Sequence, residues 1–168
     1  AKYELDWMLK MQNAENGGVY HKVTALVFPE TVLAVEETDD MVLAPISYAA
    51  TGDFAAVMAK ASVLYADYDA DFAKTCLDAA QKAYAFMEAN PDMKGYENPE
   101  EIVTGAYDDK QLKDETLWAS AELYIATKDD KYLTATKNAL QENYQPGFGW
   151  ASIGSYALYD LAKTEGVD

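Results

Sequence analysis

Aromatic and imidazole side chains that could bind a ligand lie in three long segments that show neither sustained helical nor sustained strand periodicity. Tyr20 and His21 lie in the first segment, residues 17–47, Tyr107 lies in "TGAYDD", and Trp150 lies in "GFGWAS". A planar ring can stack on the face of a sugar, and an imidazole can bond to hydroxyl groups. We therefore take Tyr20 and His21 as candidates for lining a substrate cleft. Two alternatives stay open: Tyr20 packs under its loop, and His21 caps it.

A cluster of carboxylates lies in the same first segment. The string "VEETDDM" carries four acidic residues, and calcium takes about six to eight oxygen ligands from carboxylates and carbonyls. The spacing matches no EF-hand loop, so a solvated acidic loop, or pairing with Lys22, is the competing interpretation. The candidate calcium ligands are Glu36, Asp39, Asp40 and, far along the sequence, Asp114.

Composition excludes several classes of protein. The chain has 168 residues, of which 50% are hydrophobic, so it is long enough to fold around a core. Its 13 basic and 29 acidic residues give a net charge of −16, which would repel nucleic acid and anionic membranes. No apolar run is long enough to span a bilayer. Cys76 is the single cysteine, so a disulfide or a cysteine-based zinc site within the chain is excluded, and we expect Cys76 to be buried.

Apolar spacing predicts an all-α protein. Asp69 is a candidate N-cap, Gly52 is a local weakness inside a helix, and Trp7 and Trp118 occur at the helical spacing of core residues. A small β-ribbon could form within residues 19–27. The predicted helices span residues 3–12, 46–65, 69–89, 114–126, 131–143 and 153–163.

Short and long connections alternate along the chain. Tight turns join the second helix to the third and the fourth to the fifth, whereas the other links are long. Stacked helical hairpins would place all the long links at one end. The string "ASVLYADYDADFAKTCLDAAQKAY" also resembles "AELYIATKDDKYLTATKNALQENY", and a third copy begins at "ALYDLAKTEG". Because that copy breaks off at its turn, we predict one partial domain, residues 1–168, of a larger helical toroid or solenoid.

Four strings in order resemble the catalytic module of family 9 glycoside hydrolases, in particular the branch with an N-terminal immunoglobulin-like domain. The strings are "ELDWMLKMQNAENGGVYHKVT", "FPETVLAVEETDD", "SYAATGDFAAVMAKAS" and "ENPEEIVTGAYDDKQLKDETLWASAELYIATKDDKYL". The resemblance covers nearly the whole chain. It implies an (α/α)6 barrel, of which six helices would form about half.

The resemblance also implies a function. Members of this family are inverting β-1,4-glucanases, secreted enzymes that use one carboxylate as base and another as acid, about 6.5–9.5 Å apart. In the family, the base lies in an Asp-Ala-Gly-Asp motif upstream of the "WMLKMQ" helix and the acid is a glutamate near the C-terminus. Neither motif occurs in this sequence, so we assign no catalytic residue and expect the isolated chain to be inactive. The carboxylates of "TGDFAA" and "YDADFA" are interpreted as caps or surface charges.

By the same resemblance, Tyr107 and Trp150 fall near aromatic surfaces on which sugars stack. The chemistry needs no cofactor, while some family members bind structural calcium near this face. The expected partners are cellulose or cello-oligosaccharides, together with the missing parts of the module or a second copy of the chain. Two alternatives are a non-catalytic helical repeat scaffold, which should have short loops at both ends, and a carbohydrate-binding module, which should have a closed repeat.

Overall fold

The structure is a computed structural model that describes residues 1–141 and 146–167. Over this part of the chain it is all-α, as predicted, with four strands of two residues each. The helices are α1 (Lys2–Leu9), α2 (Tyr48–Tyr65), α3 (Ala70–Ala89), α4 (Lys113–Thr127), α5 (Asp130–Gln141) and α6 (Gly154–Lys163). The strands are β1 (Val19–Tyr20), β2 (Val23–Thr24), β3 (Val42–Leu43) and β4 (Ile46–Ser47).

The predicted helices are all present, with differences at their ends. Asp69 caps α3 as expected, because its Oδ1 accepts a hydrogen bond from the Phe72 backbone N–H at 3.1 Å. Helix α2 begins two residues later than predicted because Ile46 and Ser47 form β4. Ser47 then caps α2, accepting from the Ala50 N–H at 3.1 Å. The last two residues predicted for the fifth helix lie outside the described residues.

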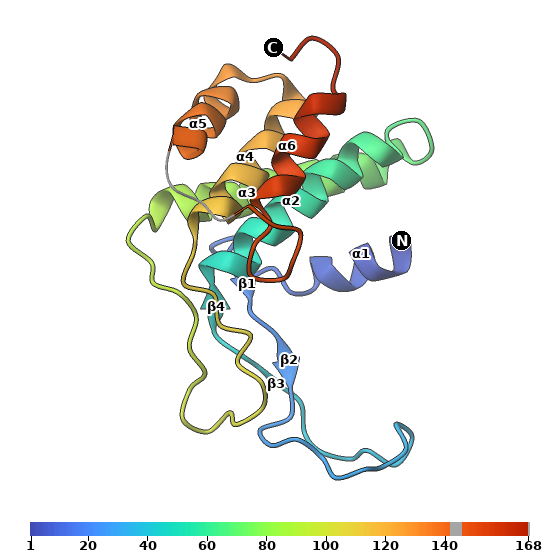
Figure 1. Cartoon of the computed structure of the whole chain (residues 1–168). Helices are drawn as coiled ribbons and strands as arrows, with labels where there is room; N and C mark the ends of the chain where they lie inside the picture. Colours follow the sequence, from blue (N-terminus) through green and yellow to red (C-terminus); the bar gives the residue numbers. More distant parts are fainter. Residues whose placement is uncertain (142–145, 168) are drawn as a thin grey trace.

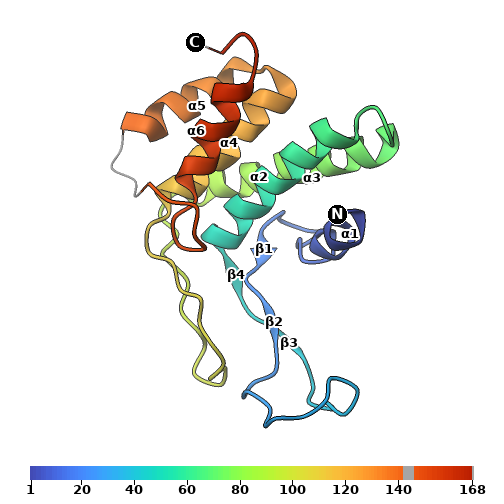
Figure 2. The same cartoon turned by 45° about the vertical axis from the view of Figure 1, so that its right-hand side comes forward.

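The helices form two layers. Helices α2, α4 and α6 lie side by side, α3 packs on α2, and α5 packs on α4 (Figures 1 and 2). Tyr84 of α3 meets Tyr132 of α5 edge to face, with ring centroids 5.2 Å apart, and this contact joins α3 and α5 into the second layer. Helix α1 flanks α3, and Gln12, just after α1, donates from Nε2 to the Ala79 carbonyl of α3 at 3.0 Å.

The turns and loops alternate as the sequence predicts. The tight turns α2–α3 and α4–α5 lie at the end opposite the long loops (Figure 1). Lys128 ends α4 in the left-handed conformation, with φ of 58°, which lets the chain reverse within the turn. The long loops therefore gather where α2, α4 and α6 begin.

The core lies mainly between the two layers. Phe54, Met58, Cys76 and Leu123 are buried there, which confirms the prediction for Cys76. Trp118 is half-buried against this core. The core prediction for Trp7 is wrong, because 45% of its surface is exposed on α1.

Gly52 is the point of closest approach between α2 and α4, rather than a tolerated weakness. A Cβ at this position would lie 2.5 Å from the Cβ of Glu115 and 3.2 Å from Cε of Met87. The missing side chain thus permits the two helices to cross, which outweighs the helix propensity that glycine loses.

Gly52→Ala should accordingly lower the free energy of unfolding by about 1–3 kcal/mol, because the added methyl forces α2 and α4 apart. Denaturant titration measures the change. Gly149→Ala is the matched control, since no heavy atom lies within 4 Å of the added Cβ, and it should stay within about 0.5 kcal/mol. A stabilised Gly52→Ala variant would show that helix propensity, and not close packing, governs this position.

Candidate functional site

The first long loop, residues 17–47, is folded back on itself by two small antiparallel ladders. Strand β1 pairs with β4, with Val19 opposite Ser47, and β2 pairs with β3, with Val23 opposite Leu43. The predicted ribbon within residues 19–27 is therefore real, although its partner strands come from residues 42–47 rather than from within the same segment. Together the ladders place the loop over the beginning of α2.

Side chains of this first loop tie it to the second long loop, residues 90–112. His21 Nε2 lies 3.0 Å from the Ala106 carbonyl oxygen, and its Nδ1 lies 2.9 Å from Ser47 Oγ. The imidazole also stacks on Tyr96, with ring centroids 3.6 Å apart and planes 11° from parallel. Because a carbonyl oxygen only accepts, Nε2 carries the proton and Nδ1 accepts from the serine hydroxyl.

The surroundings keep His21 neutral. Burial lowers its pKa, and nearby Lys22 lowers it further, while hydrogen bonds to the second loop oppose the change. With both nitrogens occupied and one face covered by Tyr96, the contacts match the alternative in which His21 caps the loops. Its contact with a sugar stays a prediction.

Lys22 reinforces the same junction. Its Nζ donates to the Gly105 carbonyl and lies 3.2 Å from Thr104 Oγ1. These partners replace the carboxylates of the acidic segment, with which Lys22 forms no ion pair in the described chain. Thr24 also bonds Thr104, with 2.8 Å between the hydroxyl oxygens. Residues 104–106 are thus held through backbone and hydroxyl groups.

Tyr107 follows directly and meets Trp150 of the third loop, residues 146–153. The two rings pack edge to face with centroids 6.2 Å apart and planes at 89°. Tyr107 adopts the left-handed backbone conformation, with φ of 52°, and its exposed fraction is 62%, against 65% for Trp150. We call these two residues the aromatic corner. Its two exposed rings meet where the second loop and the third loop come together.

Tyr20 lies elsewhere. It is half-buried, accepts a hydrogen bond from Asn13 Nδ2 at 2.9 Å, and lines a cavity of about 190 Å3 beside α1. His21 lines the same cavity, at the base of the loop that carries Tyr107, so the structure brings together Tyr107 with Trp150 and Tyr20 with His21. The contact of Tyr20 with a sugar stays a prediction.

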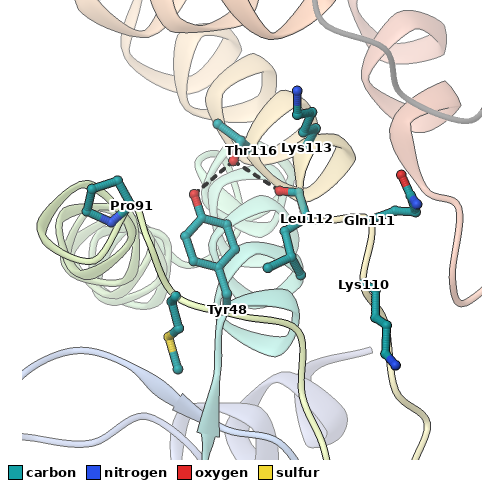
Figure 3. Close-up of a pocket in the computed structure, with 8 residues that line it drawn as sticks. Tyr48, Pro91, Lys110, Gln111, Leu112, Lys113 and Thr116 are labelled. Carbon is teal, nitrogen blue, oxygen red and sulfur yellow. Dashed lines mark hydrogen bonds between the residues drawn. The ribbon is translucent and has the colours of Figure 1, made fainter.

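Another cavity, of about 600 Å3, is separate from these residues. Figure 3 shows Tyr48 at its centre, with the phenol oxygen 2.9 Å from Thr116 Oγ1, which donates to the Leu112 carbonyl at 3.3 Å. Lys110 and Lys113 extend to opposite ends of it. None of the residues singled out from the sequence lines this cavity. Its volume alone therefore does not define the functional site.

Sequence reasoning missed a group of buried carboxyls beneath the loops. Asp53, expected as a cap or surface charge, has a buried Oδ1 without a hydrogen-bond partner, and Asp109, Asp114 and Glu115 each have one such oxygen. This corrects the interpretation of "TGDFAA". Asp53 is half-buried as a whole residue and lines the cavity beside α1, while its Oδ1 lies inside, near the charges of Asp109 and Asp114.

Burial and mutual repulsion keep some of these carboxyls protonated. Burial is the larger cause and the charge of Asp114 the next, and together they raise the pKa of Asp53 to about 7 and that of Glu115 to about 10. The pKa of Asp109 is raised as well, mainly by burial. Glu115 is therefore uncharged in neutral solution.

The acidic segment does not assemble the predicted calcium ligands. Glu36, Asp39 and Asp40 are exposed in the first loop, whereas Asp114 is buried at the start of α4 and accepts from the Ile153 N–H at 2.8 Å. In residues 1–141 and 146–167 no group of three or more His, Cys, Asp and Glu side chains is arranged to hold a metal ion. The residues named for calcium therefore do not fit it as arranged.

Two layers of helical hairpins, with three long loops at one end, define part of an (α/α) barrel. Residues 1–166 match the family described as Glycosyl hydrolase family 9. The chain belongs to this family, and its neighbours among solved structures have the (α/α)6 barrel that the sequence resemblance implies. Among the described residues, no helix is long and apolar enough to cross a membrane.

Several relatives show the extent of the match. The chain is 41% identical to the xyloglucan-specific endo-β-1,4-glucanase BoGH9A of Bacteroides ovatus, over 88% of this chain and 27% of that protein. It is 35% identical to a cellodextrinase of Butyrivibrio fibrisolvens, over 98% of this chain and 33% of that one. The structure of AaCel9A with cellobiose-like isofagomine matches with a TM-score of 0.93 and 39% identity, over 98% of this chain and 31% of AaCel9A. The chain thus spans between 27% and 33% of the length of these three proteins.

The buried carboxyls predict how stability depends on pH. In the unfolded chain Asp53 and Glu115 ionise near their ordinary pKa values of 3.8 and 4.5, whereas the folded chain holds the protons to higher pH. The free energy of unfolding should therefore fall by a few kcal/mol, as an order of magnitude, as pH rises from about 5 to about 8. Denaturant titration in EDTA, which keeps divalent cations away, measures this slope.

Glu115→Gln should flatten that slope, because the amide cannot ionise. Glu101→Gln changes an exposed carboxylate of the second loop and is the control that should leave the slope unchanged. A wild-type chain whose stability rises between pH 5 and 8 would contradict the assignment of protonated buried carboxyls.

Proposed function

We propose that this chain is the central part of the catalytic module of an inverting β-1,4-glucanase, and that its long loops form part of the wall of the glucan cleft. The aromatic corner is the observation that carries the proposal. Exposed rings held at a fixed angle on a loop face suit the apolar faces of pyranose rings, and His21 and Lys22 hold the adjoining backbone.

The substrate class is inferred from relatives. Relatives of the chain include a xyloglucan-specific endo-β-1,4-glucanase, a cellodextrinase and an endoglucanase, and we infer from all three a substrate of β-1,4-linked glucose. AaCel9A, which is similar to this chain, takes a cellobiose-like ligand. We infer that cello-oligosaccharides or cellulose contact the aromatic corner, and that the protein acts outside the cell. The immunoglobulin-like branch stays a prediction.

We further propose that the catalytic base and acid are supplied from outside these residues. An inverting hydrolysis needs one ionised carboxylate to activate water and one protonated carboxyl for the leaving oxygen, about 6.5–9.5 Å apart. Asp53 Oδ1 and Glu115 Oε2 are buried without a hydrogen-bond partner, so we do not assign these carboxyls to the chemistry. Two carboxyls and a water suffice for the reaction, so the proposal includes no cofactor.

Apolar side chains on α1 and along the first layer support a further expectation about assembly. Trp7, Leu64 and Tyr159 are 45%, 61% and 54% exposed. Exposed apolar surface of this kind usually marks an interface. We propose that another part of the module covers it, or that the isolated chain self-associates, which light scattering would show as a mass above that of one chain.

Hydrolysis of cellohexaose by the purified chain tests the assignment of the catalytic groups. We expect no turnover, with intact mass recorded on the same sample to establish that the chain is whole. Turnover by the intact chain would overturn the proposal that base and acid lie elsewhere, and would direct attention to Asp39, Asp40, Asp108 and Asp114.

Binding of cellohexaose, measured by calorimetry, tests the aromatic corner. Trp150→Ala and Tyr107→Ala should each weaken binding about tenfold, the effect of losing about 1.4 kcal/mol of stacking. Tyr68→Ala is the matched control, because Tyr68 is 87% exposed at the opposite, tight-turn end and should not affect binding. Equal affinities in all three variants would place the glucan elsewhere and favour the scaffold interpretation.

A further inference from the structure

Helix α6 is attached to the rest of the molecule mainly through α4. Ala157 and Leu161 pack on Leu117 and Ala121, and Tyr156 stacks on Trp118 with ring centroids 5.1 Å apart. These apolar contacts attach α6 to α4, and α6 has no extensive packing with α2. A cluster of polar side chains in the C-terminal half of α6 joins this helix to α2 as well.

The cluster joins one residue from each helix of the first layer. Lys60 of α2 pairs with Asp160 of α6, and its Nζ lies 3.7 Å from Oε1 of Glu122 on α4. The carboxyls of Glu122 and Asp160 thus approach the same ammonium group and interact with each other. The side chain of Glu122 is 2% exposed, that of Asp160 13% and that of Lys60 38%, so the anionic groups are enclosed and the cation reaches solvent.

The hydrogen bonds of Glu122 require a proton. Trp118 donates from Nε1 to Glu122 Oε1 at 3.0 Å, so this oxygen is already an acceptor. Two ionised carboxylates enclosed beside a single ammonium group repel each other, which favours a proton on one of them. Burial raises the pKa of Glu122 to about 8, and Lys60 and Lys163 help to lower the pKa of Asp160. The proton therefore resides on Glu122.

This placement balances the charges in the cluster. With Glu122 neutral, the charges of Lys60 and Asp160 cancel; with Glu122 ionised, the cluster gains an enclosed negative charge next to another. Lys163 lines the same groove and faces solvent, while no charged side chain of α3 or α5 lines it in the described chain. No further cation on the neighbouring helices lines the groove to offset that charge.

We propose that Lys60, Glu122 and Asp160 form a proton-dependent latch that holds α6 against α2 and α4, and that the latch weakens when Glu122 loses its proton. The third loop runs directly into α6, and Gly147 N–H donates to Ser155 Oγ of that helix at 2.9 Å. The latch thereby sets the position of Trp150. Only this last consequence rests on the proposed glucan binding.

The sign of the pH effect follows from linkage. An opened α6 would let Glu122 ionise near its ordinary pKa of 4.5, whereas the closed state holds the proton to about 8. Opening should be least favourable below that lower value, and should become easier as pH rises toward the upper one. Amide hydrogen exchange of α6 peptides, expressed as protection factors, measures the opening in the 168-residue chain.

Between pH 5.5 and 7.5 the protection factors of α6 should fall about tenfold or more. Glu122→Gln should reduce this fall, because the amide can still accept from Trp118 but cannot ionise. Asp78→Asn removes an exposed carboxylate on α3 and should leave the fall intact.

A second variant keeps the test decisive if Glu122→Gln fails to fold. Asp160→Asn removes the anion that repels an ionised Glu122, so it should also reduce the pH dependence of α6 protection. Protection of α6 that is independent of pH in the wild type would overturn the latch. So would an undiminished fall in whichever of the two variants folds. Because no glucan is present, these outcomes are separate from failure of the proposed function.

Discussion

The close crossing of α2 and α4 is the constraint on which the remaining structure depends. Gly52 allows the helices to approach until its Cα lies over the side chain of Glu115. The other helices then pack on this pair, with α3 on α2 and both α5 and α6 on α4. Because α2 and α4 begin at the same end, their crossing also fixes where the first two long loops start, and so where the loops can meet.

The same close packing explains how a chain with a net charge of −16 buries acidic side chains. Charge repulsion and loss of water both favour the neutral form of a carboxyl, and neutral carboxyls can share hydrogen bonds where carboxylates would repel. Glu115 and Glu122 are enclosed in this way on opposite ends of α4. His21 follows the same rule with the opposite sign, since its burial favours the uncharged imidazole.

The long loops at one end of the molecule are held together by few loop side chains. His21 and Lys22 anchor the second loop through backbone oxygens of Gly105 and Ala106, and Tyr107 follows at the next position. Anchoring through backbone groups fixes the path of the loop without occupying its exposed side chains. This leaves the rings of the aromatic corner exposed, whereas the cavity around Tyr48 is lined by other residues.

The sequence by itself determined the helices, the alternation of tight turns and long loops, and the family, because helical periodicity, the Asp69 cap and short motifs are local properties. It also singled out Tyr107 and Trp150 as candidates. Only the tertiary structure decided that Asp53 has a buried oxygen, that Gly52 lies where two helices approach closely, and that Tyr20 lies apart from the aromatic corner. It likewise decided that His21 reaches Ala106, 85 positions away. Burial and partner choice depend on which distant segments pack together, and local spacing carries little of that information.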